Sequence, residues 1–127
     1  MKYLEALGLM LISIFAPIQA VLATTLALIA VDLISGVVAA AKRGEKITSA
    51  GFRRSISKLI VYEVALMIGF VAETYMLPFL PVTKMISSLI SLTELKSIFE
   101  NMDSASGGGL LKTIIDKLGS ENAQPKD

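Results

Sequence analysis

The longest uncharged stretch of the chain sets the first constraint on its fold. Between Glu5 and Asp32 lie 26 consecutive residues without a charged side chain. About 20 apolar residues in a helix cross the hydrocarbon core of a bilayer, which is about 30 Å thick. A helix in the core of a soluble protein does not usually need that length. Only 18% of the 127 residues are charged and 54% are hydrophobic, so a small membrane protein is favoured over an unusually apolar soluble bundle.

The composition also excludes several kinds of site. The chain contains no Cys and no His. Disulfides, the usual zinc and haem ligands, and Cys–His nucleophile pairs are therefore absent. The net charge of +1 gives no indication of nucleic-acid binding. We expect no enzymatic activity, no cofactor and no metal.

Proline divides the first apolar region. Pro17 lies inside it, and a proline in a helix removes a hydrogen bond and kinks or breaks the helix. We expect a short helix over 3–16 and a membrane-spanning helix over 18–41. The short helix is about 20 Å long, too short to cross alone. It could lie in the interface, re-enter, or stack on the spanning helix, and we expect no signal-peptide cleavage because another apolar segment would follow it.

Two further apolar segments follow. Gly44 and the residues 47–49 predict a turn with a helix cap at Ser49 or nearby. A second apolar helix over 50–77 ends before Pro78. A third helix over 82–102 is weaker as a span, because two charged residues bracket only nine uncharged ones.

The C-terminal part of the chain changes in composition. Residues 103–109 predict a flexible linker, and residues 110–118 a short amphipathic helix. A polar, disordered tail over 119–127 is expected to follow. The sequence therefore predicts an all-α membrane protein with two to three transmembrane helices and a short N-terminal apolar helix. Its membrane-embedded helical domain covers 1–103, and the linker, amphipathic helix and tail cover 104–127.

A basic loop predicts the orientation in the membrane. Six of the twelve basic residues lie in seventeen positions, and they are Lys42, Arg43, Lys46, Arg53, Arg54 and Lys58. Loops rich in Lys and Arg stay on the cytoplasmic side. We therefore expect the N-terminus outside and, if the third helix crosses, the C-terminus in the cytoplasm. These basic residues are mainly a topology signal and a cytoplasmic anchor. Binding of anionic lipid head groups is a secondary role.

Asp32 is the most unusual residue of the first spanning helix. A central Asp costs about 2.5–3.5 kcal/mol on insertion scales, whereas each Ile, Leu or Val contributes about −0.3 to −0.6 kcal/mol. Residues 18–41 contain eleven of these apolar residues, so insertion is still favoured. Small residues share the face of Asp32 and predict close approach of another helix. They are Ser35, Gly36, Ala39 and Ala40.

The depth of Asp32 predicts its partner. Asp32 lies about 13 Å from the loop end of its helix, and Lys58 lies about 12 Å from the start of the next. We expect an ion pair between Asp32 and Lys58, or Arg54 one turn lower. Such a pair could only fix the packing, or it could act as a polar switch for assembly.

Two other acids lie in the second helix. Glu63 and Glu73 share roughly one side of it with Leu66 and Phe70. They are about 15 Å apart, too far to act together on one bond. One acid could pair with Lys58, or with a lysine of the third helix. Together they indicate a face that meets water or another protomer.

The third helix carries a polar stripe with an apolar face opposite. The stripe contains Lys84, Ser87, Ser88, Ser91 and Glu94, and the opposite face contains Ile86, Leu89, Ile90 and Leu92. The helix could lie in the interface with its stripe towards water. Alternatively, the stripe could line an aqueous pore in an oligomer.

The segment from Val31 to Leu59 resembles phage holin family 4, which includes the toxin-secretion holins. The resemblance rests on Asp32 followed by Gly36, on a basic loop with a Ser, and on Gly51 and Lys58 leading into the next helix. It covers about 30 residues strongly and about 90 loosely. Glu63, Glu73 and the longer C-terminal tail depart from the family pattern.

The resemblance implies a phage lysis protein. Such a protein associates with itself in the inner membrane of the bacterial host, and the lesions it opens let an endolysin reach the cell wall. The implied partners are further copies of the chain and the lipid bilayer, with a functional link to an endolysin and without nucleic acid.

Two other functions compete with this one. The alternative is a virion-associated or injected phage membrane protein that contributes to a genome-delivery channel. A proton-coupled transporter using Asp32 or Glu63 is less favoured, because aromatic residues make up only 6% and four full spans cannot be counted.

Overall fold

The structure is a computed structural model that describes residues 1–121. Within that range the chain forms helices and turns and no strand. The elements are α1 (Lys2–Phe15), a 3₁₀ turn η1 (Ala16–Ile18), α2 (Gln19–Lys42), α3 (Ser49–Tyr75), α4 (Val82–Ala105) and α5 (Leu110–Glu121). The expectation of a small all-α protein with a short N-terminal helix and a C-terminal helix is confirmed.

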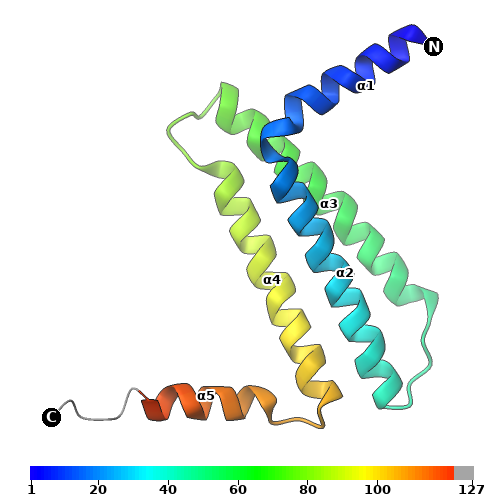
Figure 1. The fold of residues 1–127 in the computed structure, drawn as a ribbon, viewed down its shortest axis with the longest axis vertical. Coiled ribbons are helices and arrows are strands. Elements are labelled where there is room, and N and C mark those ends of the chain that lie inside the picture. Colours follow the sequence, from blue (N-terminus) through cyan, green and yellow to red (C-terminus); the bar gives the residue numbers. More distant parts are fainter. Residues whose placement is uncertain (122–127) are drawn as a thin grey trace, which may run out of the picture.

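Three long helices form a bundle. In Figure 1, α2 and α4 run in the same direction and α3 runs antiparallel to both. At one end of the bundle α1 leaves at an angle, beside the turn from α3 to α4. At the other end lie the loop from α2 to α3 and helix α5, which crosses the bundle direction. The helix over 82–102 therefore packs along its two neighbours and does not lie across their ends.

Pro17 divides the N-terminal apolar region as expected. It lies in η1, and the boundaries of α1 and α2 agree with the expected 3–16 and 18–41 to within one residue. No residue of α1 is buried. Its C-terminal end contacts the bundle through Phe15, whose ring centroid lies 6.2 Å from that of Phe70 on α3.

The C-terminal boundaries differ from the expected ones. Helix α4 continues to Ala105, so the predicted linker over 103–109 is helical in its first three residues. The turn into α5 depends on glycine, because Gly107, Gly108 and Gly109 have φ of 89°, 79° and 102°, which other residues rarely adopt. Helix α5 extends three residues beyond the expected 110–118, and the rest of the predicted polar tail, 122–127, lies outside the described residues.

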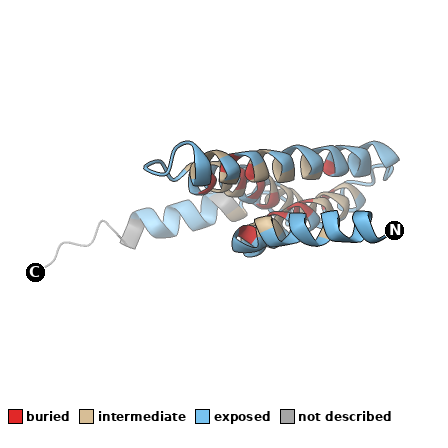
Figure 2. Ribbon diagram, turned by 90° about the horizontal axis from the view of Figure 1, so that it is seen from above, coloured by how far each residue is buried: buried red, intermediate tan, exposed pale blue. Residues whose placement is uncertain are grey.

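The bundle is apolar outside and partly polar inside. Figure 2 shows buried residues only along the narrow line where the helices meet. Among the side chains that the structure describes, six apolar ones are buried, and the buried polar ones are almost as numerous: Thr25, Asp32, Ser55, Thr83 and Glu94. Large apolar side chains are exposed on every helix, among them Leu11, Ile34, Ile60, Leu92 and Ile115. This is the reverse of the arrangement in a soluble protein.

Two segments are long and apolar enough to cross a membrane. They are Lys2–Lys42 and Ser49–Tyr75, with mean hydropathy of 2.2 and 1.7 over 18 residues. Only 17% of either stretch is buried, whereas the core helix of a soluble protein would be mostly buried. Together with the apolar exterior, this describes a small helical membrane protein.

Two small residues let the helices approach closely. Ala39 of α2 is completely buried. At Gly69 of α3, an added Cβ would lie 2.6 Å from Cδ1 of Ile86 on α4. Small residues at helix contacts allow close packing in lipid, where hydrophobic association between helices is weak.

Candidate functional site

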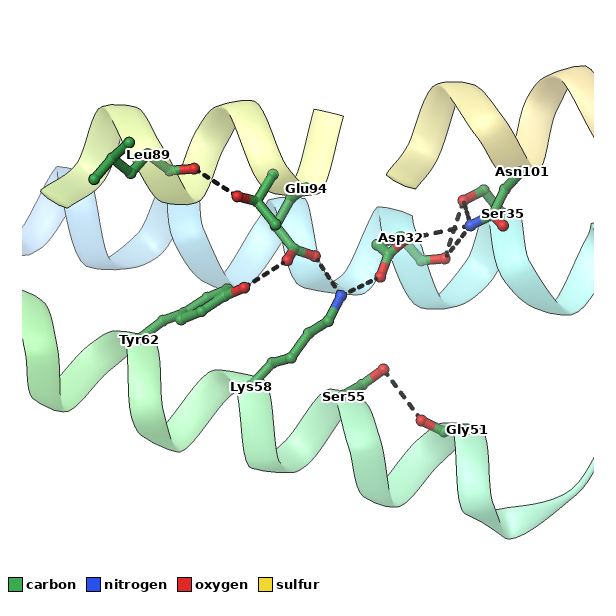
Figure 3. A network of polar contacts seen from close by, with 10 residues as sticks. Asp32, Ser35, Gly51, Ser55, Lys58, Tyr62, Leu89, Glu94 and Asn101 are labelled. Carbon is green, nitrogen blue, oxygen red and sulfur yellow. Dashed lines mark hydrogen bonds and ion pairs between the residues drawn. The ribbon is translucent and has the colours of Figure 1, made fainter. Parts of the chain in front are cut away.

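Charged side chains from the three long helices meet in the interior of the bundle. The ammonium of Lys58 on α3 donates to Oδ2 of Asp32 on α2 at 2.7 Å, and to Oε2 of Glu94 on α4 at 2.9 Å (Figure 3). These are the distances of charge-assisted hydrogen bonds. One lysine therefore connects all three helices.

Neutral side chains complete the hydrogen bonding of the two carboxylates. The hydroxyl of Tyr62 donates to Oε1 of Glu94 at 3.1 Å (Figure 3). The amide of Asn101 donates to Oδ1 of Asp32 at 3.2 Å and to the hydroxyl of Ser35 at 3.1 Å. We call Asp32, Lys58, Tyr62, Glu94 and Asn101 the polar cluster.

The polar cluster is shielded, and its charges do not cancel. The side chain of Glu94 is 0% exposed, that of Asp32 10% and that of Lys58 24%. Two carboxylates and one ammonium give one formal negative charge in excess. Removing one partner from a buried ion pair costs about 3–5 kcal/mol, because the other charge is left without compensation. Loss of Lys58 would leave two facing carboxylates, so this residue has the largest effect on the cluster.

The expected ion pair and the small-residue face are found at this site. Asp32 pairs with Lys58 and not with Arg54, which lies one turn nearer the loop. The face of Asp32 meets α4, since an added Cβ at Gly36 would lie 3.4 Å from Nδ2 of Asn101. On the same face Ala39 is buried, and Ser35, Gly36 and Ala40 are half-buried. A role of this face in association between copies stays a prediction.

One residue of the expected polar stripe lies in the polar cluster. Glu94 is fully buried in the polar cluster of the single chain, and its role in facing water or lining a pore stays a prediction. Ile90, expected on the apolar face opposite the stripe, is also buried. The inner face of α4 is set by its packing on two helices, and it contains Thr83, Ile90, Glu94 and Ile98. Of the remaining stripe, Lys84 and Ser88 are exposed and Ser87 and Ser91 are half-buried.

The two acids on α3 have different environments. Oε2 of Glu73 accepts the backbone N–H of Thr83 at 2.8 Å, so Glu73 caps the start of α4 from the neighbouring helix. Neither acid pairs with Lys58, whose partners are Asp32 and Glu94. Glu63 is half-buried, and within residues 1–121 its carboxylate has no hydrogen bond or ion pair. A water-facing role of Glu63 stays a prediction.

Tyr62 and Asn101 belong to the polar cluster although they were not among the residues predicted from the sequence. Tyr62 follows Lys58 by four residues, and Asn101 follows Glu94 by seven. Both spacings place the residue on the same helix face as the charged group. A polar residue one or two helical turns from an intramembrane charge is therefore the sequence pattern that could have identified both residues.

The basic end of the bundle is held by one arginine. Arg43 donates to both carboxylate oxygens of Glu45, at 2.6 and 2.9 Å, and to the hydroxyl of Ser104 at 2.5 Å. The guanidinium lowers the pKa of Glu45 below its ordinary value through these hydrogen bonds, and the pKa of Arg43 is raised. These contacts join the α2–α3 loop to the end of α4. Lys42, Lys46, Arg53 and Arg54 are exposed near the same end.

The start of α3 lacks the expected side-chain cap. Thr48 is the N-cap residue, and its side chain makes no capping hydrogen bond. The helix covers Ser49–Tyr75 and not the expected 50–77, so Ser49 is its first residue and the expected cap is not formed. The first amides of the helix are left to other acceptors.

A cavity of about 540 Å³ extends from the loop to the polar cluster. It lies beside α2 and the first turns of α3, and it reaches α4 at Ser97 and Asn101. Asp32 and Lys58 line its deep end, and Lys46 and Arg54 line it near the loop. The polar cluster thus borders a cavity that continues to the loop between α2 and α3.

The arrangement holds helices together and offers no reacting group. Both carboxylates of the cluster already accept hydrogen bonds from Lys58 and from a neutral donor. What the cluster can do is fix the relative position of three helices by charge, and release that position if water or another charge replaces Lys58.

Comparison with known proteins gives one family. A profile described as the bacteriophage holin family matches residues 9–120. The match covers the three-helix bundle and most of α5. No curated protein and no solved structure matches the chain.

Proposed function

Because the chain belongs to the bacteriophage holin family, we propose that it acts as a holin in the inner membrane of the bacterial host. In this role, copies of the chain associate and open lesions through which an endolysin reaches the cell wall. The family is one of non-enzymatic membrane proteins, and the polar cluster is a structural and not a catalytic device.

The proposal is supported most directly by the charged interior of a thin, apolar bundle. The exterior of α2 and α3 suits acyl chains, while Asp32, Lys58 and Glu94 lie inside. In lipid, ionisable groups face the interior of a bundle or a water-filled cavity. The closed subunit satisfies the first condition. A lesion would satisfy the second, with the polar cluster exchanging protein partners for water.

The positions of the basic residues support one orientation. Lys42, Arg43, Lys46, Arg53 and Arg54 gather at the loop end of the bundle, which we place in the cytoplasm by the positive-inside rule. The α1 end then lies outside. Helix α4 has 24 residues and a length of about 36 Å, enough to cross between its neighbours. Helix α5 would lie along the cytoplasmic surface.

Glu63 supports association between copies. Its carboxylate is half-buried on α3, beside the exposed Ile60 and Val64. An ionised carboxylate in lipid needs a partner or water. A neighbouring copy, or the water of a lesion, would supply what the single chain does not.

The experiment that tests the proposal is expression in a bacterium with and without a cytoplasmic endolysin. Culture turbidity and membrane potential are followed together. We expect an abrupt loss of potential in both strains, and lysis only in the strain with the endolysin. A chain that inserts stably and leaves the potential intact would contradict the proposal and favour a virion-associated channel component.

A further inference from the structure

The cavity at the loop end has more positive charge than its own acids neutralise. Two acids line it, Asp32 and Glu45. Asp32 is occupied by Lys58, and both carboxylate oxygens of Glu45 are occupied by Arg43. Within residues 1–121, Lys46 and Arg54 form no ion pair. Two cations at the cavity are therefore left without an acidic partner among residues 1–121, and they could hold an anion.

The first turn of α3 adds donors to the same cavity. Ala50 and Gly51 line it, and the Thr48 side chain does not cap the helix. The first amides of a helix have no acceptor within the helix, and the helix dipole favours an anion there. Backbone amides beside Lys46 and Arg54 suit a phosphate group in particular.

The apolar wall of the cavity indicates which phosphate. Leu33 and Val37 of α2 and Ile47 of the loop line it, and Ile47 is exposed. A free phosphate ion would gain nothing from these side chains. A phospholipid at the end of two membrane-length helices would place its head group at the cations and its chains along α2. Basic pockets between membrane helices on the cytoplasmic side are known to hold anionic head groups.

We propose that this cavity binds the phosphate head group of an anionic phospholipid, held by Lys46, Arg54 and the first turn of α3. The volume of about 540 Å³ is ample for a head group and within the range of small-molecule sites. The bound lipid bridges α2 and α3 directly below Asp32 and Lys58. Lipid composition would then affect the stability of the closed bundle.

Native mass spectrometry of the full chain in a non-ionic detergent tests this site. The chain is mixed with dioctanoyl phosphatidylglycerol, with dioctanoyl phosphatidylcholine, or with inorganic phosphate followed by phosphatidylglycerol. The variants are Arg54→Gln and the matched control Arg53→Gln, since Arg53 is adjacent on α3 and exposed but does not line the cavity. Circular dichroism checks that both variants keep the helical content of the wild type.

We expect retention of phosphatidylglycerol and little of phosphatidylcholine. Because one basic residue near anionic lipid contributes about 1 kcal/mol, Arg54→Gln should weaken retention about fivefold. Arg53→Gln should stay close to the wild type. Equal losses in both variants would overturn the proposal, because they would indicate attraction to net charge alone. Displacement by millimolar phosphate, or no preference between the two lipids, would overturn the assignment to a lipid head group.

The site and the holin function can fail separately. Lipid retention is measured in detergent and does not depend on lysis. A chain that retains phosphatidylglycerol through Arg54 but does not lyse cells would contradict only the proposed function.

Discussion

The ammonium of Lys58 lies 2.9 Å from the carboxylate of Glu94, although 36 residues separate them in the sequence. This contact joins α3 to α4, while the second contact of the same ammonium joins α3 to α2. By itself, α4 is a weak membrane span, because a charged residue lies at each end of its serine-rich segment, Lys84 and Glu94. Paired with Lys58, Glu94 can be carried inside a bundle whose exterior is apolar.

Replacing Lys58 should cause the largest loss of stability. In Lys58→Met, two buried carboxylates face each other without a cation, and breaking a buried pair costs about 3–5 kcal/mol. We expect a lower thermal midpoint by circular dichroism in detergent. Lys84→Met is the matched control, because Lys84 is exposed on α4.

A variant with compensating substitutions separates the effect of unpaired charge on stability from the effect of altered packing. Adding Asp32→Asn and Glu94→Gln to Lys58→Met removes every charge of the cluster, so much of the lost stability should return. If the triple variant is as unstable as Lys58→Met alone, charge imbalance is not the cause. If Lys58→Met behaves as Lys84→Met, the cluster does not hold the bundle.

Tyr62→Phe should destabilise the bundle moderately. It removes the hydrogen bond to Oε1 of Glu94, and hydrogen bonds to charged groups contribute about 1.5–3 kcal/mol. Tyr75→Phe is the control, because Tyr75 is exposed at the end of the same helix. Detergent unfolding curves should separate the two variants, and coincident curves would exclude Tyr62 from the cluster.

Glu73→Ala should loosen the first turn of α4. Glu73 accepts the backbone N–H of Thr83, and loss of an N-terminal cap costs about 0.5–2 kcal/mol. Hydrogen exchange should become faster at residues 82–86 and stay unchanged near Ala105. Glu5→Ala, which removes an exposed acid from α1, should leave both regions as they are. Unchanged exchange in Glu73→Ala would contradict the cap.

Gly69→Leu should separate α3 from α4. Even a Cβ at this position would lie 2.6 Å from Cδ1 of Ile86, and overpacking costs about 1–3 kcal/mol. Shortening the neighbour, in Gly69→Leu with Ile86→Ala, should recover part of the thermal midpoint. Gly8→Leu is the control, because no other side chain lies within 4 Å of a Cβ there. A midpoint of Gly69→Leu equal to that of Gly8→Leu would contradict close packing at Gly69.

The positions of the helices could be predicted because they depend on local residues. Pro17 and Pro78 interrupt helices whatever surrounds them. The pairing of Asp32 with Lys58 could also be predicted, because both lie at matching depths on consecutive helices joined by a short loop. Each of these features depends on one helix or on one pair of consecutive helices.

The face of α4 that packs towards the other helices could not be predicted from its own sequence. Its inner face depends on the groove formed by α2 and α3 together, which its own periodicity does not contain. Glu94 was therefore grouped with the serines in one stripe that faces water or a pore, whereas in the single chain it is fully buried against Lys58 and Tyr62. Likewise, the expected linker began too early, because α4 continues to Ala105 and its Ser104 accepts a hydrogen bond from Arg43 at the end of α2.

In the proposed mechanism, the polar interior of the bundle faces water when a lesion opens. Single-cysteine labelling tests this most directly, since the chain has no Cys of its own. Ser91→Cys lies half-buried on α4, and Leu92→Cys lies beside it on the apolar exterior. Both variants must keep the lysis time of the wild type. A membrane-impermeant thiol reagent is then added before and after the loss of membrane potential.

We predict that Ser91→Cys is protected before the loss of potential and reacts after it, and that Leu92→Cys is protected throughout. Reaction at Leu92→Cys with continued protection of Ser91→Cys would contradict the account, because the apolar exterior and not the polar interior would then line the lesion.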